Sequence, residues 1–238
     1  MGQVTGAAGD VGGNGSDRGV EETPPAGTGP PVESTLVGVC GGSGSGKTTL
    51  AHRLVEALGA DQAICLSFDS YYRDLAELSV EERAQVNFDH PDSLDVAMLV
   101  DHLRLLRGGR EIAVPHYDFV NHTRSADIDL VEPHRYVIVE GILLFAFPEI
   151  RAELDVLVFR QCDEATRAER RLRRDVTERG RSPESVRQQW ATTVQPMHEL
   201  HVEPYARHAD VVTTQDQELD AIVARLAGSL RSTPSRAS

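Results

Sequence analysis

Short apolar runs alternate with longer amphipathic stretches along this chain. Five runs are rich in apolar and β-branched residues, which predicts five short buried strands over residues 35–40, 63–67, 136–140, 154–159 and 209–213. Apolar positions recur at helical spacing between them, which predicts helices over residues 48–58, 93–107, 164–179 and 185–195. Strands that alternate with helices predict an α/β fold, with a parallel sheet covered by helices on both faces.

Residues 112–131 depart from this alternation. Aromatic and polar residues lie there between breakers, among them Pro115, Tyr117, Phe119 and His122. Such a pattern is typical of a small β-hairpin, and we expect it as an insertion in the α/β fold.

The composition agrees with one soluble domain. The chain has 238 residues, 40% of them hydrophobic and 26% charged, which suits a single domain that we place over residues 35–230. Residues 1–34 are rich in Gly and Pro and carry few bulky apolar side chains, so we expect a disordered extension, and a disordered tail over 231–238. The apolar runs are too short to cross a bilayer, so no membrane partner is expected.

The charge and the cysteines limit the possible partners. A formal net charge of −13 disfavours nucleic-acid binding, which needs a basic surface, but allows a local pocket for a small phosphate ligand. Cys40, Cys65 and Cys162 are widely spaced without a CxxC pair, so neither a disulfide framework nor a zinc site is indicated. A cytoplasmic location fits best.

A phosphate-binding loop follows the first predicted strand. The segment from Gly41 to Thr48 fits the pattern G-x-x-x-x-G-K-[ST], and it lies between a strand and a helix, the context that this motif requires. Its glycines let backbone N–H groups surround phosphate oxygens, and the helix N-terminus adds positive potential. Lys47 is expected to reach the β- and γ-phosphates and Thr48 to bind Mg²⁺. The alternative is a flexible Gly/Ser turn. The expected nucleotide-binding residues are Gly41, Gly42, Ser43, Gly44, Ser45, Gly46, Lys47, Thr48 and Thr49.

Two acidic residues follow predicted strands at the edge where α/β folds bind ligands. Asp69 comes after the second strand and could accept the proton of an attacking hydroxyl, or it could cap a helix. Glu140 ends a buried apolar strand, where an unpartnered carboxylate is costly. We expect it to face Mg²⁺ opposite the phosphate loop, with Thr48 and Asp69; the alternative is a salt bridge at the strand end.

Several further segments, taken together, resemble the uridine kinase (uridine–cytidine kinase) family. They are GGSGSGKTT, SFDSYY, NFDHPDSLD, PHYDFVNHTR, VIVEGILLF, RDVTERGRS and HADVV, and they span about residues 37–212 in the order of the family. The resemblance implies a P-loop kinase with a hairpin insertion and an arginine-rich lid. It implies transfer of the γ-phosphate of ATP or GTP to the 5′-hydroxyl of uridine or cytidine, with Mg²⁺ as cofactor. It also implies a homotetramer.

The resemblance also implies roles for particular residues. Asp69 would be the catalytic base, and Asp89 would bind the ribose 2′- and 3′-hydroxyls, which favours ribose over deoxyribose. His122 could serve both uracil and cytosine, because a neutral imidazole donates at one nitrogen and accepts at the other. Lys47, Arg171 and Arg174 would assist the transfer. The implied nucleoside and lid residues are Tyr72, Phe88, Asp89, Tyr117, Phe119, His122, Arg171, Arg179, Arg181 and Gln189.

Each of these roles has a structural alternative. The aromatic residues and His122 could simply pack, and Asp89 could form a turn. The arginines between 167 and 181 could form a solvated helix face, paired with Glu164, Glu169 and Asp175. The sequence also departs from the family at Gln161 and Cys162, where an acid followed by Thr is common, so a change in lid anchoring is expected.

Other functions on the same scaffold remain open at this point. A kinase of ribulose 5-phosphate would need extra basic residues for the substrate phosphate, and a pantothenate kinase would need a more apolar acceptor pocket. A regulator that senses nucleotides would show no acceptor-dependent turnover. The segments NFDHPDSLD and PHYDF argue against the two kinases.

Overall fold

The computed structural model describes residues 34–83 and 85–232. The predicted disordered extension and tail lie outside the described residues, apart from Ser34, Arg231 and Ser232. Ser34 is buried, and its hydroxyl donates a hydrogen bond to the backbone oxygen of His134 at 2.7 Å. The folded domain therefore includes Ser34.

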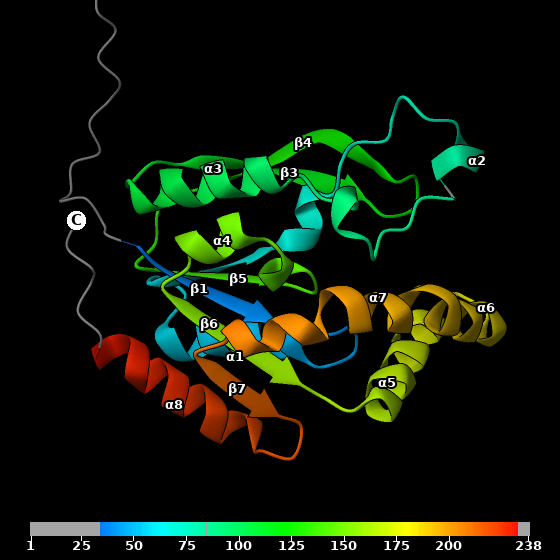
Figure 1. Ribbon diagram of the computed structural model, residues 1–238. Coiled ribbons are helices and arrows are strands. Elements are labelled where there is room, and N and C mark those ends of the chain that lie inside the picture. Colours follow the sequence, from blue (N-terminus) through cyan, green and yellow to red (C-terminus); the bar gives the residue numbers. More distant parts are fainter. Residues whose placement is uncertain (1–33, 84, 233–238) are drawn as a thin grey trace, which may run out of the picture. The chain divides into compact units, whose positions relative to one another are not determined.

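A five-stranded parallel sheet lies at the centre of the domain, in the order β2-β5-β1-β6-β7 (Figure 1). Its strands are β1 (Thr35–Cys40), β2 (Ala63–Ser67), β5 (Tyr136–Gly141), β6 (Val156–Gln161) and β7 (Val211–Thr214). All five strands and the parallel sheet expected from the sequence are confirmed. The strands β6 and β7 begin two residues later than expected.

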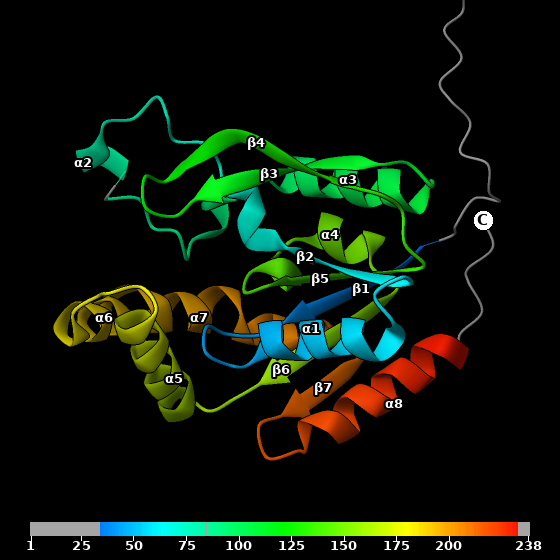
Figure 2. The same ribbon diagram turned by 180° about the vertical axis from the view of Figure 1, so that it is seen from behind.

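Helices cover both faces of this sheet (Figures 1 and 2). One face packs against α1 (Lys47–Leu58) and α8 (Leu219–Ser232), through a core that includes Val37 and Val39 of β1. The other face packs against α3 (Val96–Arg107) and α4 (Pro148–Glu153), through a core that includes Leu36 and Cys40. Side chains of one strand alternate between the two cores, as expected for a strand buried on both sides.

The predicted insertion is a two-stranded antiparallel hairpin, β3 (Ile112–Asp118) and β4 (Thr123–Val131). Short helical segments precede and follow it along the chain. They are η1 (Phe68–Tyr71), α2 (Val80–Arg83), η2 (Pro91–Ser93), η3 (Leu144–Ala146) and η5 (Glu203–His208).

The predicted helix over residues 185–195 is wrong in its extent. The structure has α6 (Pro183–Gln189), a π-helical turn over Trp190–Val194, and then α7 (Gln195–His201). Together with α5 (Glu164–Thr177), these elements form a group beside the end of β6 (Figure 1). In the described part of the chain, no helix has the length and apolar character needed to cross a membrane.

Candidate active site

The phosphate loop joins the end of β1 to the start of α1, as the sequence predicted. Gly44 and Gly46 have φ angles of +80° and +88°, which other residues rarely adopt. A Cβ atom on Gly44 would lie 2.4 Å from the backbone oxygen of Arg167, so glycine is required there. The α1 helix begins directly at Lys47, and its first-turn residues Thr48 and Thr49 are exposed. Backbone N–H groups and hydroxyls are therefore available to phosphate oxygens.

Polar and charged residues from distant parts of the sequence meet next to this loop. Strands β1, β5 and β2 are neighbours, and the register pairs Glu140 with both Val39 and Ser67. Lys47 Nζ lies 3.4 Å from Glu140 Oε2, and the Ser67 hydroxyl donates to Glu140 Oε1 at 3.3 Å. The ion pair proposed as the alternative role of Glu140 is thus present.

Asp69 lies in η1, two residues after β2. The expected alternative, a helix cap, falls to Ser67 instead, whose hydroxyl accepts a hydrogen bond from the Asp69 N–H. Burial raises the pKa of Asp69, while the positive charge of Lys47 lowers it and the negative charge of Glu140 raises it. A carboxylate with a raised pKa is a stronger proton acceptor than an ordinary aspartate.

A metal ion would fit beside Glu140. In the described residues, no three His, Cys, Asp or Glu side chains form a group that could hold a metal ion. Mg²⁺ in phosphoryl-transfer sites is held by one or two protein oxygens together with phosphate oxygens and water, so it needs no such cage. Glu140 Oε2 is buried and forms an ion pair with Lys47, but it accepts no hydrogen bond in the described part of the chain; the Thr48 hydroxyl lies at the start of α1. This donor set matches what Mg²⁺ prefers.

The predicted nucleoside residues form one aromatic cluster. The Tyr72 ring lies 5.3 Å from Tyr117, 5.6 Å from Phe88 and 6.3 Å from Phe119, measured between ring centroids. The His122 ring stacks on Phe88 at 4.3 Å, with 16° between the planes. Phe119 is 54% exposed, so it forms the open side of the cluster. Tyr72, which directly follows η1, is thereby brought together with Phe88 and with residues of the hairpin.

Two polar atoms in this cluster lack partners. Tyr117 Oη and His122 Nδ1 are buried and have no hydrogen-bond partner among the described residues. Burial lowers the pKa of His122, so the neutral imidazole is favoured. His122 also has a φ angle of +56°, which is uncommon for a residue other than glycine. Unpartnered buried polar groups are costly unless a ligand completes them.

Asp89 directly follows Phe88 of the aromatic cluster and lines a small pocket together with Gly42 and Ser43 of the phosphate loop. Burial raises its pKa, and the guanidinium of Arg171 lowers it. Burial raises the pKa of Tyr72 well above its usual value, and the charges of Asp69 and Asp89 add to the effect. The Tyr72 hydroxyl donates a hydrogen bond to the backbone oxygen of Phe88, the residue before Asp89, at 3.2 Å.

The predicted lid arginines surround one buried carboxylate, Asp175. Arg174 donates two hydrogen bonds to Asp175 Oδ1, at 2.9 and 2.8 Å. Arg171, Arg179 and Arg181 form ion pairs with the same carboxylate at 3.4–3.8 Å. The solvated face considered above is therefore wrong for Arg171 and Asp175, which are buried.

One of these arginines also contacts the phosphate loop. Arg171 Nη1 donates to the Ser43 hydroxyl at 2.9 Å, and its Nη2 donates to Gln189 Oε1 at 3.0 Å. Gln189 also accepts a hydrogen bond from Arg181, at 2.6 Å. Two lid arginines were predicted to assist the transfer. Arg171 contacts the phosphate loop, whereas Arg174 is bound to Asp175.

Asp163, which directly follows the unusual Gln161–Cys162 pair, anchors the lid helix. Asp163 caps α5 by accepting a hydrogen bond from the Thr166 N–H at 2.8 Å. Its own N–H donates to Gln215 Oε1 at 2.8 Å, and the Gln215 amide donates back to the Asp163 carboxylate. The lid helix is thereby tied to the loop after β7.

The comparisons with known proteins agree with this geometry. Residues 36–220 match the model of the family described as "Phosphoribulokinase / Uridine kinase family". The chain belongs to the phosphoribulokinase/uridine kinase family. A uridine kinase of Chloroflexus aurantiacus is 43% identical over 203 residues, which is 84% of this chain and 97% of that protein. A uridine kinase of Ligilactobacillus salivarius is 40% identical over 200 residues, 82% and 94% of the two chains.

A solved structure of the same family has a similar fold. Phosphoribulokinase from Rhodobacter spheroides superposes with a TM-score of 0.59 at 13% identity, covering 76% of this chain and 70% of that one. An identity this low shows the fold alone. The predicted fold class and the predicted enzyme class, a kinase built on a P-loop, are confirmed for this member of the phosphoribulokinase/uridine kinase family.

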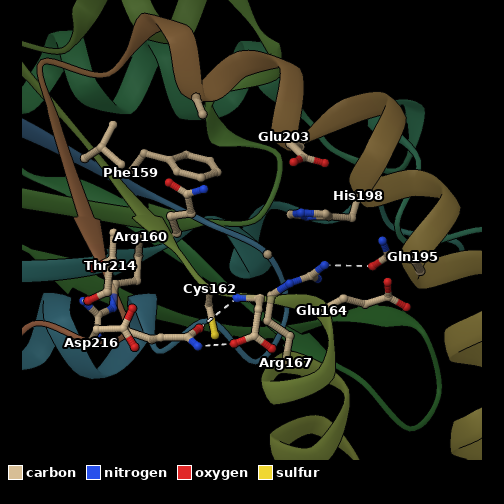
Figure 3. A pocket seen from close by; sticks show the side chains of 16 residues that line it. Phe159, Arg160, Cys162, Glu164, Arg167, Gln195, His198, Glu203, Thr214 and Asp216 are labelled. Carbon is tan, nitrogen blue, oxygen red and sulfur yellow. Dashed lines mark hydrogen bonds between the residues drawn. The ribbon is translucent and has the colours of Figure 1, made fainter.

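This kinase has a cavity of about 650 Å³ next to its phosphate loop (Figure 3). It lies between the ends of β6 and β7, the start of α5, and the segment formed by α7 and η5. Among the residues predicted to bind ligands, Gly42 alone lines it. The predicted nucleoside residues therefore do not belong to this cavity.

Sequence reasoning missed two side chains beside the loop, Arg167 and His198. A Cβ atom on Gly42 would lie 2.8 Å from Arg167 Nη1 and 2.7 Å from His198 Nδ1. Arg167, Arg171 and Asp175 are spaced four residues apart, so they lie on one face of α5, and all three are buried. This spacing was a signal in the sequence. No local pattern pointed to His198.

Proposed function

We propose that this protein is a pyrimidine ribonucleoside kinase, which transfers the γ-phosphoryl group of ATP or GTP to the 5′-hydroxyl of uridine or cytidine. The two relatives named above, at 40–43% identity, are both uridine kinases. One set of contacts carries the proposal: the Asp69 N–H donates to the Ser67 hydroxyl, this hydroxyl donates to Glu140, the ion-pair partner of Lys47, and Tyr72 of the aromatic cluster lies three residues after Asp69. A proton acceptor between a phosphate site and a ring pocket suits transfer to a nucleoside hydroxyl.

On the donor side, the phosphate loop would hold the triphosphate. Backbone N–H groups and the α1 N-terminus stabilise the phosphate charge, and Lys47 neutralises the β- and γ-phosphates. Glu140 and Thr48 would hold Mg²⁺, which supplies further charge neutralisation when bound. Glu140 Oε2 supports this assignment, because it is buried next to Lys47 and accepts no hydrogen bond among the described residues.

On the acceptor side, the aromatic cluster would hold the pyrimidine. A pyrimidine ring could stack against the aromatic side chains, and its polar edge could pair with Tyr117 Oη and His122 Nδ1. Asp89 would accept hydrogen bonds from the ribose 2′- and 3′-hydroxyls. Asp69 would then receive the proton of the 5′-hydroxyl as the new P–O bond forms.

The lid would supply cations over the migrating phosphoryl group. Arg171 reaches Ser43 of the loop, and Arg174, Arg179 and Arg181 are collected around Asp175 nearby. Preorganised cations of this kind stabilise the charge of the transition state. Closure of such a lid excludes water and so favours transfer over hydrolysis.

A sugar phosphate is a weaker candidate for the acceptor. It would need free cations near the acceptor pocket to bind its phosphate. Two arginines near the hairpin, Arg83 and Arg124, are already engaged: Arg83 donates to the backbone oxygens of Leu75 and Ala76, and Arg124 donates to that of Tyr72 and pairs with Asp95. The side chains of the aromatic cluster are uncharged at neutral pH.

An acceptor panel tests the proposal. ADP release is measured with purified protein and magnesium ATP in the presence of uridine, cytidine, deoxycytidine, adenosine, ribulose 5-phosphate or pantothenate. We expect release with uridine and cytidine at rates well above all others. Release that is strongest with ribulose 5-phosphate or pantothenate would overturn the proposed acceptor, and release without any acceptor dependence would favour a nucleotide-sensing role.

We also propose a cytoplasmic homotetramer, which size-exclusion chromatography with light scattering would test.

A further inference from the structure

Arg167 is an unexplained buried cation. Its side chain is 2% exposed, and among the described residues its Nε and Nη1 atoms have no hydrogen-bond partner. Only Nη2 is engaged, by donating to Gln195 Oε1 at 2.7 Å. A buried guanidinium with free donors costs stability, unless an anion completes it.

The position of this guanidinium is fixed by its surroundings. The ring of Trp190, in the π-helical turn, lies 5.2 Å from Arg167 Cζ. Gln195 begins the helix that follows, and Gly42 of the phosphate loop lies against Nη1. The π-helical turn and α7 therefore hold the guanidinium next to the loop.

A second unpartnered group lies beside them. His198 Nδ1 is buried, has no hydrogen-bond partner in the described part of the chain, and touches the same side of Gly42. Burial and the charge of Arg167 lower the pKa of His198 to about 4. The imidazole is therefore neutral near pH 7, where it can donate one hydrogen bond.

Both residues line the cavity of about 650 Å³ beside the loop (Figure 3). The carboxylates of Asp163, Glu164 and Glu203 line its other parts. Burial lowers the pKa of Arg167, and the charges of these acids raise it in part, but none of them forms an ion pair with it among residues 34–83 and 85–232. These acids repel an anion from the rim, so the inner end next to Gly42 is the favourable place for one.

We propose that Arg167 and His198 form an anion subsite against Gly42 that binds a phosphoryl group. The unpartnered N–H groups of a guanidinium suit phosphate oxygens, and a neutral imidazole adds one further donor. The phosphoryl group has two possible sources. The first is the terminal phosphate of a triphosphate bound to the loop, and this possibility rests on the proposed function. The second is another phosphate-bearing molecule in the cavity, and this possibility is independent of the proposed function.

Binding measurements with three probes test the subsite and separate the sources. ADP, a non-hydrolysable ATP analogue and inorganic phosphate are titrated into the protein by calorimetry with magnesium present. If the subsite binds the terminal phosphate of the triphosphate, we expect Arg167→Gln to lower the affinity for the analogue about tenfold or more, while the affinity for ADP stays within about twofold. If the subsite binds a second phosphate-bearing molecule, we expect inorganic phosphate to bind to wild-type protein that is already saturated with the analogue. We then expect Arg167→Gln to abolish this binding.

Matched variants keep the test decisive. Arg173→Gln removes an exposed arginine from the same helix and should leave all three affinities unchanged. Arg167→Lys keeps the charge and should restore part of the lost affinity. His198→Phe keeps the bulk of the ring, and it provides an independent test if Arg167→Gln does not fold; we expect about a threefold or greater loss. Wild-type affinities for all three probes in the folded Arg167 and His198 variants would overturn the proposal. The experiment uses no nucleoside, so its outcome is independent of acceptor identity.

Discussion

At the residue scale, the account depends first on Asp69. Replacing Asp69 with Asn removes the proton acceptor but keeps the size of the side chain, so we expect kcat to fall by about 10²–10⁴ while affinity for ATP stays close to wild type. Steady-state kinetics and calorimetric titration of the nucleotide measure the two effects. Asp61→Asn, at an exposed position after α1, is the matched control. A variant of Asp69 with a kcat within threefold of wild type would remove it as the base.

The pH dependence of kcat is a second test of Asp69. Because burial raises its pKa, activity should be lost on the acid side at a higher pH than for an ordinary aspartate. The positive charge of Arg179 lowers this pKa. Arg179→Gln should therefore move the acid limb of the kcat profile to higher pH, whatever its effect on the maximal rate. A shift toward lower pH would contradict the assignment, and Arg173→Gln should cause no shift.

Asp89 is predicted to select ribose over deoxyribose. Its carboxylate is partly buried, so a substrate without the 2′-hydroxyl leaves it without a partner. In Asp89→Asn the ratio of kcat/KM for uridine to that for deoxyuridine should fall by about tenfold or more. Competition between the two nucleosides in one reaction measures this ratio directly. An unchanged ratio would exclude Asp89 from ribose recognition.

The sequence predicted some site residues better than others. Lys47, Thr48, Asp69 and Glu140 follow strands or belong to a spaced motif, so their positions at one edge of the sheet follow from topology. Roles for the aromatic cluster came from the family resemblance, and they remain predictions. Arg167 and His198 come together only through packing between α5 and α7, which no local pattern encodes.

At the scale of elements, the lid depends on Asp175. This carboxylate is fully buried and pairs with four arginines. Asp175→Asn leaves these cations without a counter-charge, so we expect the Tm to fall by roughly 5 °C. We also expect kcat to fall about tenfold to a hundredfold, because the arginines lose their positions. Scanning calorimetry and kinetics measure the two. Glu178→Gln, an exposed acid next to α5, should change neither.

The helical elements show where local patterns stop being informative. The helices and strands of the sheet were predicted to within a few residues, because hydrophobic periodicity specifies buried faces. The π-helical turn at Trp190–Val194 was missed. Pro196 lacks the N–H that a continuous α-helix would use, and the turn brings Trp190 against Arg167. Tertiary contacts of this kind outweigh helical periodicity.

At the scale of the whole molecule, the parallel sheet brings together residues from distant parts of the chain. The phosphate loop follows β1, η1 follows β2, and the lid helix follows β6. These segments meet Glu140, near the end of β5, at the carboxyl edge of the sheet. This arrangement followed from the alternation of strands and helices in the sequence. The fold and the family are thus established, and the acceptor is the part that needs measurement.

The most direct measurement identifies the product. Purified protein is incubated with magnesium ATP and uridine, and UMP and ADP are quantified by chromatography and mass spectrometry, with Asp69→Asn as the comparison. The account predicts one 5′-UMP for each ADP, and almost none of either from the variant. ADP formed without any pyrimidine monophosphate, from uridine or from cytidine, would contradict it.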